Sequence, residues 1–171
     1  MSEQPSSPQL VRDLMKVGVM TCSPETPVVD LARLMLEKDL EAFVVLEPGE
    51  GHALGIVSQD ELVKIYGREE ARSLKAEDVM RAGVPQVPPD IPLAAAAQIM
   101  QDQGVRALFL MHHAGGIEYP AAVLTYTHLL RHLAAGSHEE LRDLGIQAQR
   151  STPMETFIQR RDEARARYKK K

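Results

Sequence analysis

The sequence is poor in the residues on which several protein classes depend. Cys22 is the only cysteine in 171 residues, which excludes a disulfide framework and a thiolate zinc cage and favours a reducing compartment. Tryptophan is absent and aromatic residues make up 4%, so surfaces that stack nucleic-acid bases are not expected. No apolar run approaches the roughly 18 residues of a membrane-spanning helix, and the start, MSEQPSSPQL, lacks the basic and apolar regions of a signal peptide. These absences predict a soluble, cytoplasmic protein with no membrane partner.

The charge is unevenly distributed along the chain. Residues 1–136 carry 11 basic and 18 acidic side chains, whereas residues 137–171 carry 9 and 6. An acidic body with a short basic end differs from the broad basic surface of a dedicated nucleic-acid binder. Nucleic acid is therefore not an expected partner, and a basic C-terminal tail that binds it is the hypothesis that we rank last.

An internal repeat organises most of the chain. Residues 13–46 align without a gap on residues 78–111, at an offset of 65, and nine of the 34 positions are identical. After two extra residues in the second copy, GIVSQDEL (55–62) aligns on AVLTYTHL (122–129). The identical pairs are Asp13/Asp78, Met15/Met80, Gly18/Gly83, Val19/Val84, Pro24/Pro89, Pro27/Pro92, Ala32/Ala97, Met35/Met100 and Ala42/Ala107.

Each copy predicts the element order β-α-β-β-α. In the first copy the expected elements are an extended stretch at 19–22, a helix after Pro27, strands at 43–46 and 54–57, and a helix at 58–66. Thr26 is the expected N-cap of the first helix, with Pro27 in its first turn. The second copy repeats this order with an extended stretch at 84–87, a helix from about 93, strands at 108–111 and 121–124, and a helix at 125–134.

The copies are expected to pack on each other through their sheets, because neither small sheet can bury both faces alone. This predicts an α+β fold of two repeated units with pseudo-twofold symmetry and a C-terminal helical tail. The predicted boundaries are a disordered N-terminus at 1–9, units at 10–70 and 71–134, and a helical basic tail at 135–171.

The duplicated order of methionine, proline, apolar helix, strand, glycine-led strand and hydroxyl residue resembles a tandem pair of CBS (cystathionine-β-synthase) domains. The resemblance is carried by DLMKVGVMTCSPETPVVDLARLMLEKDLEAFVVL with GIVSQDELV, and by DVMRAGVPQVPPDIPLAAAAQIMQDQGVRALFL with AVLTYTHLL. It covers roughly residues 10–134 and implies a regulatory module that binds an adenosine-containing ligand, has no obligatory cofactor and commonly dimerises.

The family's ligand motif is glycine, two apolar residues, serine or threonine, two variable residues and aspartate. Copy one supplies Gly55, Ser58 and, in place of the aspartate, Glu61. A strand-to-helix junction offers backbone N–H groups and a helix dipole to phosphate, and a carboxylate can accept both ribose hydroxyls. However, Ser58-x-x-Glu61 is also a capping box that needs no ligand, and both interpretations stay open.

Copy two departs further from the motif, with Ala122 for glycine, Thr125 for the hydroxyl residue and His128 for aspartate. Arg106 lies just before its first strand, where family members often place a basic phosphate ligand, and we assign it to the copy-two site. The equivalent residue of copy one is Glu41, which would repel phosphate. We therefore expect at most one strong site per chain.

The adenine is expected to lie against apolar strand residues such as Met20 or Val84, with Thr21 at the edge of the cleft. The resemblance leaves AMP, ADP, ATP, S-adenosylmethionine and cyclic di-AMP open as ligands.

No catalytic or metal chemistry is predicted. The sequence has no P-loop, no GxSxG and no dinucleotide fingerprint, no nucleophile–base–acid set can be assembled, and its histidines do not form a zinc-protease pattern. The predicted function is that of a non-enzymatic, homodimeric regulatory module, which binds an adenine nucleotide (AMP, ADP or ATP-like) between the repeats. It signals to an unidentified regulated protein by conformational change. The alternative is a ligand-independent dimeric scaffold that uses the C-terminal helix, with Met154, Phe157 and Ile158 as its apolar ridge.

Overall fold

The fold was analysed in a computed structural model that describes residues 9–135. Residues 1–8 and 136–171 lie outside the described residues, and with them almost all of the predicted disordered N-terminus (1–9) and helical basic tail (135–171). Within residues 9–135 the chain is an α+β structure of two repeated units, as predicted. No helix in this part is both long and apolar enough to cross a membrane.

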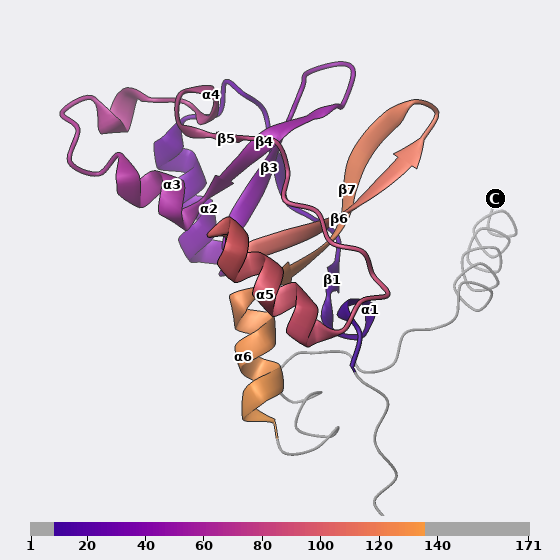
Figure 1. Cartoon of the computed structure of the whole chain (residues 1–171). Coiled ribbons are helices and arrows are strands. Elements are labelled where there is room, and N and C mark those ends of the chain that lie inside the picture. The colour runs from indigo at the N-terminus through magenta and orange to yellow at the C-terminus, as the bar shows by residue number, and fades with distance from the viewer. Residues whose placement is uncertain (1–8, 136–171) are drawn as a thin grey trace, which may run out of the picture.

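Two sheets form the framework, each with two main helices packed on it (Figure 1). The four-stranded sheet has the order β2 (Thr21–Cys22), β3 (Ala42–Leu46), β4 (Ala53–Ser58), β5 (Arg81–Ala82), with α2 (Val28–Lys38) and α3 (Gln59–Lys64). The three-stranded sheet has the order β1 (Lys16–Val17), β7 (Ile117–Thr125), β6 (Ala107–Ala114), with α5 (Leu93–Gln103) and α6 (Tyr126–Ala134). The remaining elements are α1 (Val11–Leu14), α4 (Ala76–Val79) and a 3₁₀ turn, η1 (Ala71–Ser73).

The helices α2 and α5 are equivalent and bury equivalent apolar faces. Val28, Leu31 and Met35 of α2 are buried, and so are their counterparts Leu93, Ala96 and Met100 of α5. The predicted N-cap at Thr26 is wrong. Pro27 holds the N-cap position of α2, while the Thr26 hydroxyl accepts a hydrogen bond from the Ser23 N–H in the preceding turn. A proline after the threonine shifts the start of the helix by one residue, so the hydroxyl serves the turn instead.

The two copies exchange their leading segments. β1 belongs to copy one in the sequence but pairs with β7 of copy two, and β5 belongs to copy two but pairs with β4 of copy one. The backbone hydrogen bonds that anchor these segments repeat at the offset of 65. The Val11 N–H donates to the Ile91 carbonyl, and the Ala76 N–H donates to the Thr26 carbonyl. We call this arrangement the segment exchange. Each sheet is therefore completed by a strand from the other copy.

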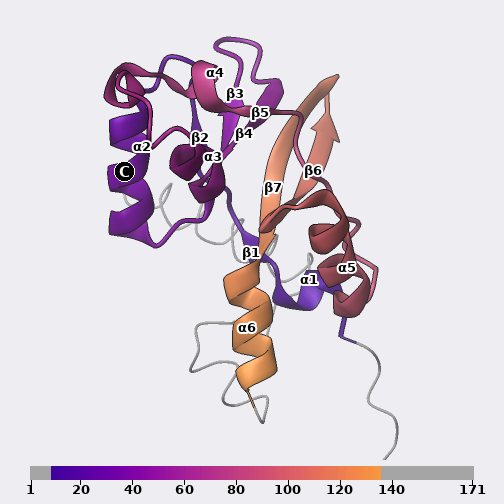
Figure 2. The same ribbon diagram turned by 60° about the vertical axis from the view of Figure 1, so that its left-hand side comes forward.

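The two sheets face each other (Figure 2). As predicted, they pack through an apolar layer. The buried residues of this intersheet layer are Val44, Ile56, Ala107, Phe109 and Met111, drawn from both sheets. Val44 and Phe109 occupy equivalent positions in the two copies and are fully buried. The layer fixes how the ends of the strands in one copy meet the helices of the other.

The segment exchange gives Gly55 a structural requirement. Gly55 pairs with Ala82, and a Cβ at this position would collide with the Arg81 carbonyl oxygen as β5 passes. The equivalent residue of β7, Ala122, pairs with Val17 and already carries a methyl group. The glycine of copy one is thus explained by close approach of β5, independently of any ligand.

Replacing Gly55 with alanine should displace β5 and lower the free energy of unfolding by about 1–3 kcal/mol, the usual range for overpacking. The comparison variant, Ala122→Gly, should lose about 1–2 kcal/mol, from added backbone freedom in the strand and loss of a buried methyl group, with β1 left in place. Urea denaturation of both variants measures the difference. If Gly55→Ala unfolded with the same free energy as the wild type, β5 would not lie so close to β4.

Candidate functional site

A small pocket lies between the two copies, where the ends of β3, β4 and β5 meet the start of β6. Its apolar lining comes from Ile56, Val105 and Ala107, with Gly104 beside them. Its polar lining contains Ser58 and Glu61 of the predicted copy-one motif, together with Glu41, Asp60, Arg81 and Arg106. The predicted hydroxyl and carboxylate of copy one therefore border one pocket.

Ser58 and Glu61 are bonded to each other at the start of α3. The Ser58 N–H donates to Glu61 Oε2 over 3.0 Å, and the Ser58 hydroxyl donates to the same oxygen. The residues form the capping box that the sequence offered as the alternative to a ligand site. The second carboxylate oxygen, Oε1, lies 3.3 Å from Lys64 Nζ, whose side chain is largely exposed. A ligand hydroxyl that reaches Glu61 would compete with this lysine.

Two opposing effects act on the pKa of Glu61. Burial, the larger single effect, raises the pKa, but the hydrogen bonds from Ser58 and the nearby Lys64 ammonium together outweigh it. The pKa of Glu61 is therefore lowered from its ordinary value of 4.5, and the side chain is an acceptor-only carboxylate at neutral pH.

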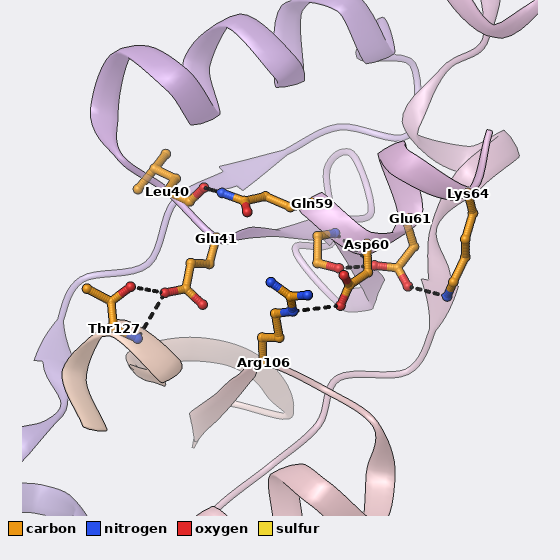
Figure 3. Close-up of polar contacts among 9 residues, drawn as sticks. Leu40, Glu41, Gln59, Asp60, Glu61, Lys64, Arg106 and Thr127 are labelled. Atoms are coloured by element: carbon orange, nitrogen blue, oxygen red, sulfur yellow. Dashed lines mark hydrogen bonds and ion pairs between the residues drawn. The ribbon is translucent and has the colours of Figure 1, made fainter. Parts of the chain in front are cut away.

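Arg106 belongs to this pocket, which corrects its assignment to the copy-two site. Its backbone carbonyl accepts from the Tyr126 N–H, but its Nε lies 3.3 Å from Asp60 Oδ2 on α3 of copy one (Figure 3). The two sheets face each other across the intersheet layer. Because of this packing, Arg106, which precedes β6 of copy two, reaches α3 of copy one. The copy-one motif and the basic residue of copy two thus share one cleft.

The equivalent contact, at the start of α6, joins Glu41 to Thr127, and we call this place the second cleft. Glu41 precedes β3 as Arg106 precedes β6, and Thr127 occupies the position of Asp60 in the second copy. Glu41 Oε1 accepts from the Thr127 N–H over 3.1 Å and from the Thr127 hydroxyl (Figure 3). The amides at 126–128 are all bonded within the chain, to the carbonyl of Arg106, the carboxylate of Glu41 and the hydroxyl of Thr125. This leaves the start of α6 occupied by the protein's own acceptors.

Thr125 and His128 form a second capping box, with histidine in the place usually held by glutamate. The Thr125 N–H donates to His128 Nδ1 over 3.1 Å, and the His128 N–H approaches the Thr125 hydroxyl at 3.4 Å. An imidazole that accepts at Nδ1 carries its proton on Nε2 and is neutral. Burial, with the charges of Arg131 and Lys16, lowers the pKa of His128 from 6.5 to about 4.

The remaining predicted residues lie apart from the pocket lining. Met20 and Thr21 stand at the edge strand β2, where the Met20 carbonyl accepts from the Val44 N–H and Thr21 pairs with Val44. Both side chains are exposed, with 38% of Met20 accessible. Their contact with adenine stays a prediction. Cys22, next in the strand, packs beside the copy-one core, and burial raises its pKa to about 11.

The sequence reasoning missed Asp60 and Arg81 as members of the site. Arg81 donates to the Gln103 carbonyl over 3.1 Å at the C-terminal end of α5 and so ties β5 of one sheet to a helix of the other. Asp60 could have been found from its neighbour Glu61, but its partner depends on how the copies pack. Among residues 9–135, no group of three His, Cys, Asp or Glu side chains is placed to hold a metal ion.

The depressed pKa of His128 makes folding stability depend on pH. An unfolded chain takes up this proton near pH 6.5 and the folded chain only near pH 4, so the unfolded state holds more protons between these values. Stability should therefore fall by about 2 kcal/mol as the pH is lowered from 7 to 4.5. His128→Gln, which keeps an acceptor for Thr125 but cannot take up a proton, should flatten this dependence. His132→Gln on the same helix is the control, and equal slopes in the two variants, measured by urea denaturation, would contradict the assignment.

Comparison with known proteins places this geometry in context. The family model for the CBS domain matches residues 11–68 and 76–135. No curated protein sequence matched the chain. Solved structures do match. The conserved CBS domain protein TA0289 of Thermoplasma acidophilum has a TM-score of 0.64 at 23% identity, covering 81% of this chain and 75% of that one.

Two further matches are structures of complexes. The CBS domain pair of the protein MJ0100, in complex with 5′-methylthioadenosine and S-adenosyl-L-methionine, has a TM-score of 0.64 at 13% identity and covers 74% of this chain and 97% of that one. The CBS domain of a bacterial CNNM/CorC family Mg²⁺ transporter, in complex with ATP, has a TM-score of 0.55 at 17% identity, with coverages of 71% and 84%. At these identities the likeness shows the fold.

The family model matches twice in tandem and spans more than half of the chain, and its two matches begin at the two exchanged segments, α1 and α4. The chain therefore belongs to the CBS domain family and contains a pair of CBS units.

Proposed function

We propose that this protein is a CBS-pair regulatory module that binds an adenosine-containing ligand in the copy-one cleft and passes the binding event to a partner protein by conformational change. The observation that carries the proposal is the meeting of Ser58 and Glu61 from copy one with Arg106 from copy two around one pocket. A ligand held there contacts both copies at once. Its affinity therefore depends on how the copies are arranged.

The Arg106–Asp60 pair supports a change in that arrangement on binding. It is the direct ionic link between the copies at the pocket, and its side chains are 54% and 36% exposed. An ion pair exposed to this degree contributes little stability, about 0–1 kcal/mol. A ligand that engages either partner can replace the pair at small cost. The ligand then favours one arrangement of the copies, and a partner that reads this arrangement is coupled to the ligand.

Adenosine-containing ligands are the class we favour, with AMP, ADP and ATP as the first candidates from the sequence. The carboxylate of Glu61, which lines the pocket, suits ribose hydroxyls. The complexes of similar CBS proteins with 5′-methylthioadenosine, S-adenosyl-L-methionine and ATP support this class. We further propose that the protein acts as a homodimer in the cytoplasm, without catalysis, on a regulated protein that is not identified.

A second candidate function, a scaffold that binds partners without any ligand, is favoured by one observation. Both capping boxes, Ser58 with Glu61 and Thr125 with His128, are complete within the chain. A fold that satisfies these groups itself does not require a ligand for stability. The scaffold predicts that no adenosine compound stabilises the protein.

Ligand-dependent thermal unfolding separates the two functions. A ligand at 100 times its dissociation constant should add about 2.7 kcal/mol of stability, a shift of several degrees for a chain of this length. Ser58→Ala should abolish the shift, because it removes the pocket hydroxyl. The matched control is Thr125→Ala, which removes the same cap hydroxyl from the other helix and should keep the shift.

Each variant is compared with its own midpoint without ligand, because loss of a cap hydroxyl by itself costs about 1 kcal/mol. A panel of AMP, ADP, ATP, S-adenosylmethionine and cyclic di-AMP that gives no shift in the wild type would favour the scaffold. A shift lost in Thr125→Ala but kept in Ser58→Ala would move the ligand to the second cleft.

A further inference from the structure

The charges that line the pocket do not suit a phosphate group. Three carboxylates, those of Glu41, Asp60 and Glu61, face two guanidinium groups, those of Arg81 and Arg106. A phosphate monoester brings nearly two negative charges into this surrounding. Phosphate sites normally offer an excess of cations and free N–H groups. Here the two guanidinium groups of the lining do not exceed its three carboxylates, and Lys64, outside the lining, is paired with one of these carboxylates, Glu61.

The cations of the pocket already have partners. Arg106 is paired with Asp60 at 3.3 Å, and Arg81 donates to the Gln103 carbonyl at 3.1 Å. Figure 3 shows Arg106 between Asp60 on one side and Glu41 on the other. A phosphate that drew Arg106 away would place its own negative charge next to the Asp60 carboxylate, and this repulsion adds to the small cost of losing the pair.

The N–H groups of Ser58 and Gln59, where the chain enters α3, are already bonded within the protein. The Ser58 N–H donates to the Glu61 carboxylate, and the Gln59 N–H donates to the Glu41 carbonyl over 3.0 Å. A phosphate would have to displace Glu61 to reach the first of these amides. The displaced carboxylate, itself 6% exposed, would then lack its hydrogen bonds.

Glu41 supplies the second, independent observation. Its Oε1 is held by Thr127, but Oε2 is shielded from solvent and has no hydrogen-bond partner. A buried acceptor without a donor costs free energy that a donor on a ligand would recover. Hydroxyl and amino groups can supply that donor, and a positive charge would be attracted. A phosphate supplies only acceptors and negative charge.

We infer that the copy-one pocket selects adenosine ligands that are uncharged or positively charged at the 5′ position over phosphorylated ones, and that Glu41 is the residue that determines this selectivity. The inference rests on the proposed function and narrows its ligand class. The Glu41 carboxylate also accepts a hydrogen bond from Thr127 at the start of α6, and this bond holds it in position beside the copy-one pocket.

The test is calorimetric titration of the full chain with adenosine, 5′-methylthioadenosine, S-adenosylmethionine, AMP and ATP. We expect the three compounds without phosphate to bind at least tenfold more tightly than AMP, and ATP to bind least. Glu41→Gln keeps an acceptor for Thr127 but removes the charge. It should tighten AMP binding several-fold and weaken S-adenosylmethionine binding, so that the ratio of the two affinities becomes smaller.

Glu37→Gln, which removes the same charge from an exposed position on α2, is the matched control and should leave the preference unchanged. Asp60→Asn is a second variant, which releases Arg106 and should also tighten AMP binding. Wild-type protein that binds AMP or ATP more tightly than adenosine would overturn this inference while upholding the proposed function. Equal behaviour of Glu41→Gln and Glu37→Gln would overturn the role of Glu41. A wild type that binds none of the five compounds would overturn the proposed function itself, and the inference with it.

Discussion

The apolar contact between the two sheets is the constraint on which both clefts depend. Sheets of three and four short strands cannot stay folded with both faces in water, so each covers one face with helices and the other with its counterpart. This contact brings the residue ahead of β3 to the first turn of α6 and the residue ahead of β6 to the first turn of α3. Each cleft is therefore assembled from both copies, and the chemistry of neither can be read from one copy alone.

The pseudo-twofold symmetry holds for the backbone but not for the chemistry at the clefts. At one pair of equivalent positions the chain has Arg106 with Asp60, and at the other it has Glu41 with Thr127. The first contact joins two charged side chains near solvent, where water and ions weaken it. The second places a carboxylate on backbone and hydroxyl donors at a helix start, where the helix dipole favours it. The two copies have the same backbone arrangement, but different residues stand at the equivalent positions. A ligand can therefore replace the exposed Arg106–Asp60 pair in one cleft, whereas Glu41 occupies the start of α6 in the other.

The repeat was sufficient to predict the fold class, the main helices and strands from α2 to α3 and from α5 to α6, and the face-to-face packing, because apolar periodicity and the offset of 65 report directly on local structure and burial. It did not predict the leading segments α1–β1 and α4–β5, and residues 84–87, predicted as an extended stretch, form an isolated bridge at Gln86 instead of a strand. The capping box of Ser58 and Glu61 could also be predicted from the sequence, since both partners lie in one helical turn. The assignment of Arg106 was wrong because alignment of the copies matches equivalent positions, whereas the site joins non-equivalent ones. The role of Gly55 beside β5 was hidden for the same reason: the segment that passes it begins the other copy. Apart from the local errors at the start of α2 and at Arg81, the features that could not be predicted were contacts between the copies.

The segment exchange also bears on how the chain folds. The strand that completes the first sheet, β5, begins some twenty residues after that sheet's previous strand ends, and β1 must wait for β7, about a hundred residues later, before it has a partner. Contacts so distant in sequence close large loops before they gain stability, which slows folding and leaves half-made sheets with open edges. Neither copy can reach its final structure while the other is unfolded. The pair of copies is thus one cooperative folding unit, so a substitution at either cleft changes the stability of both copies together.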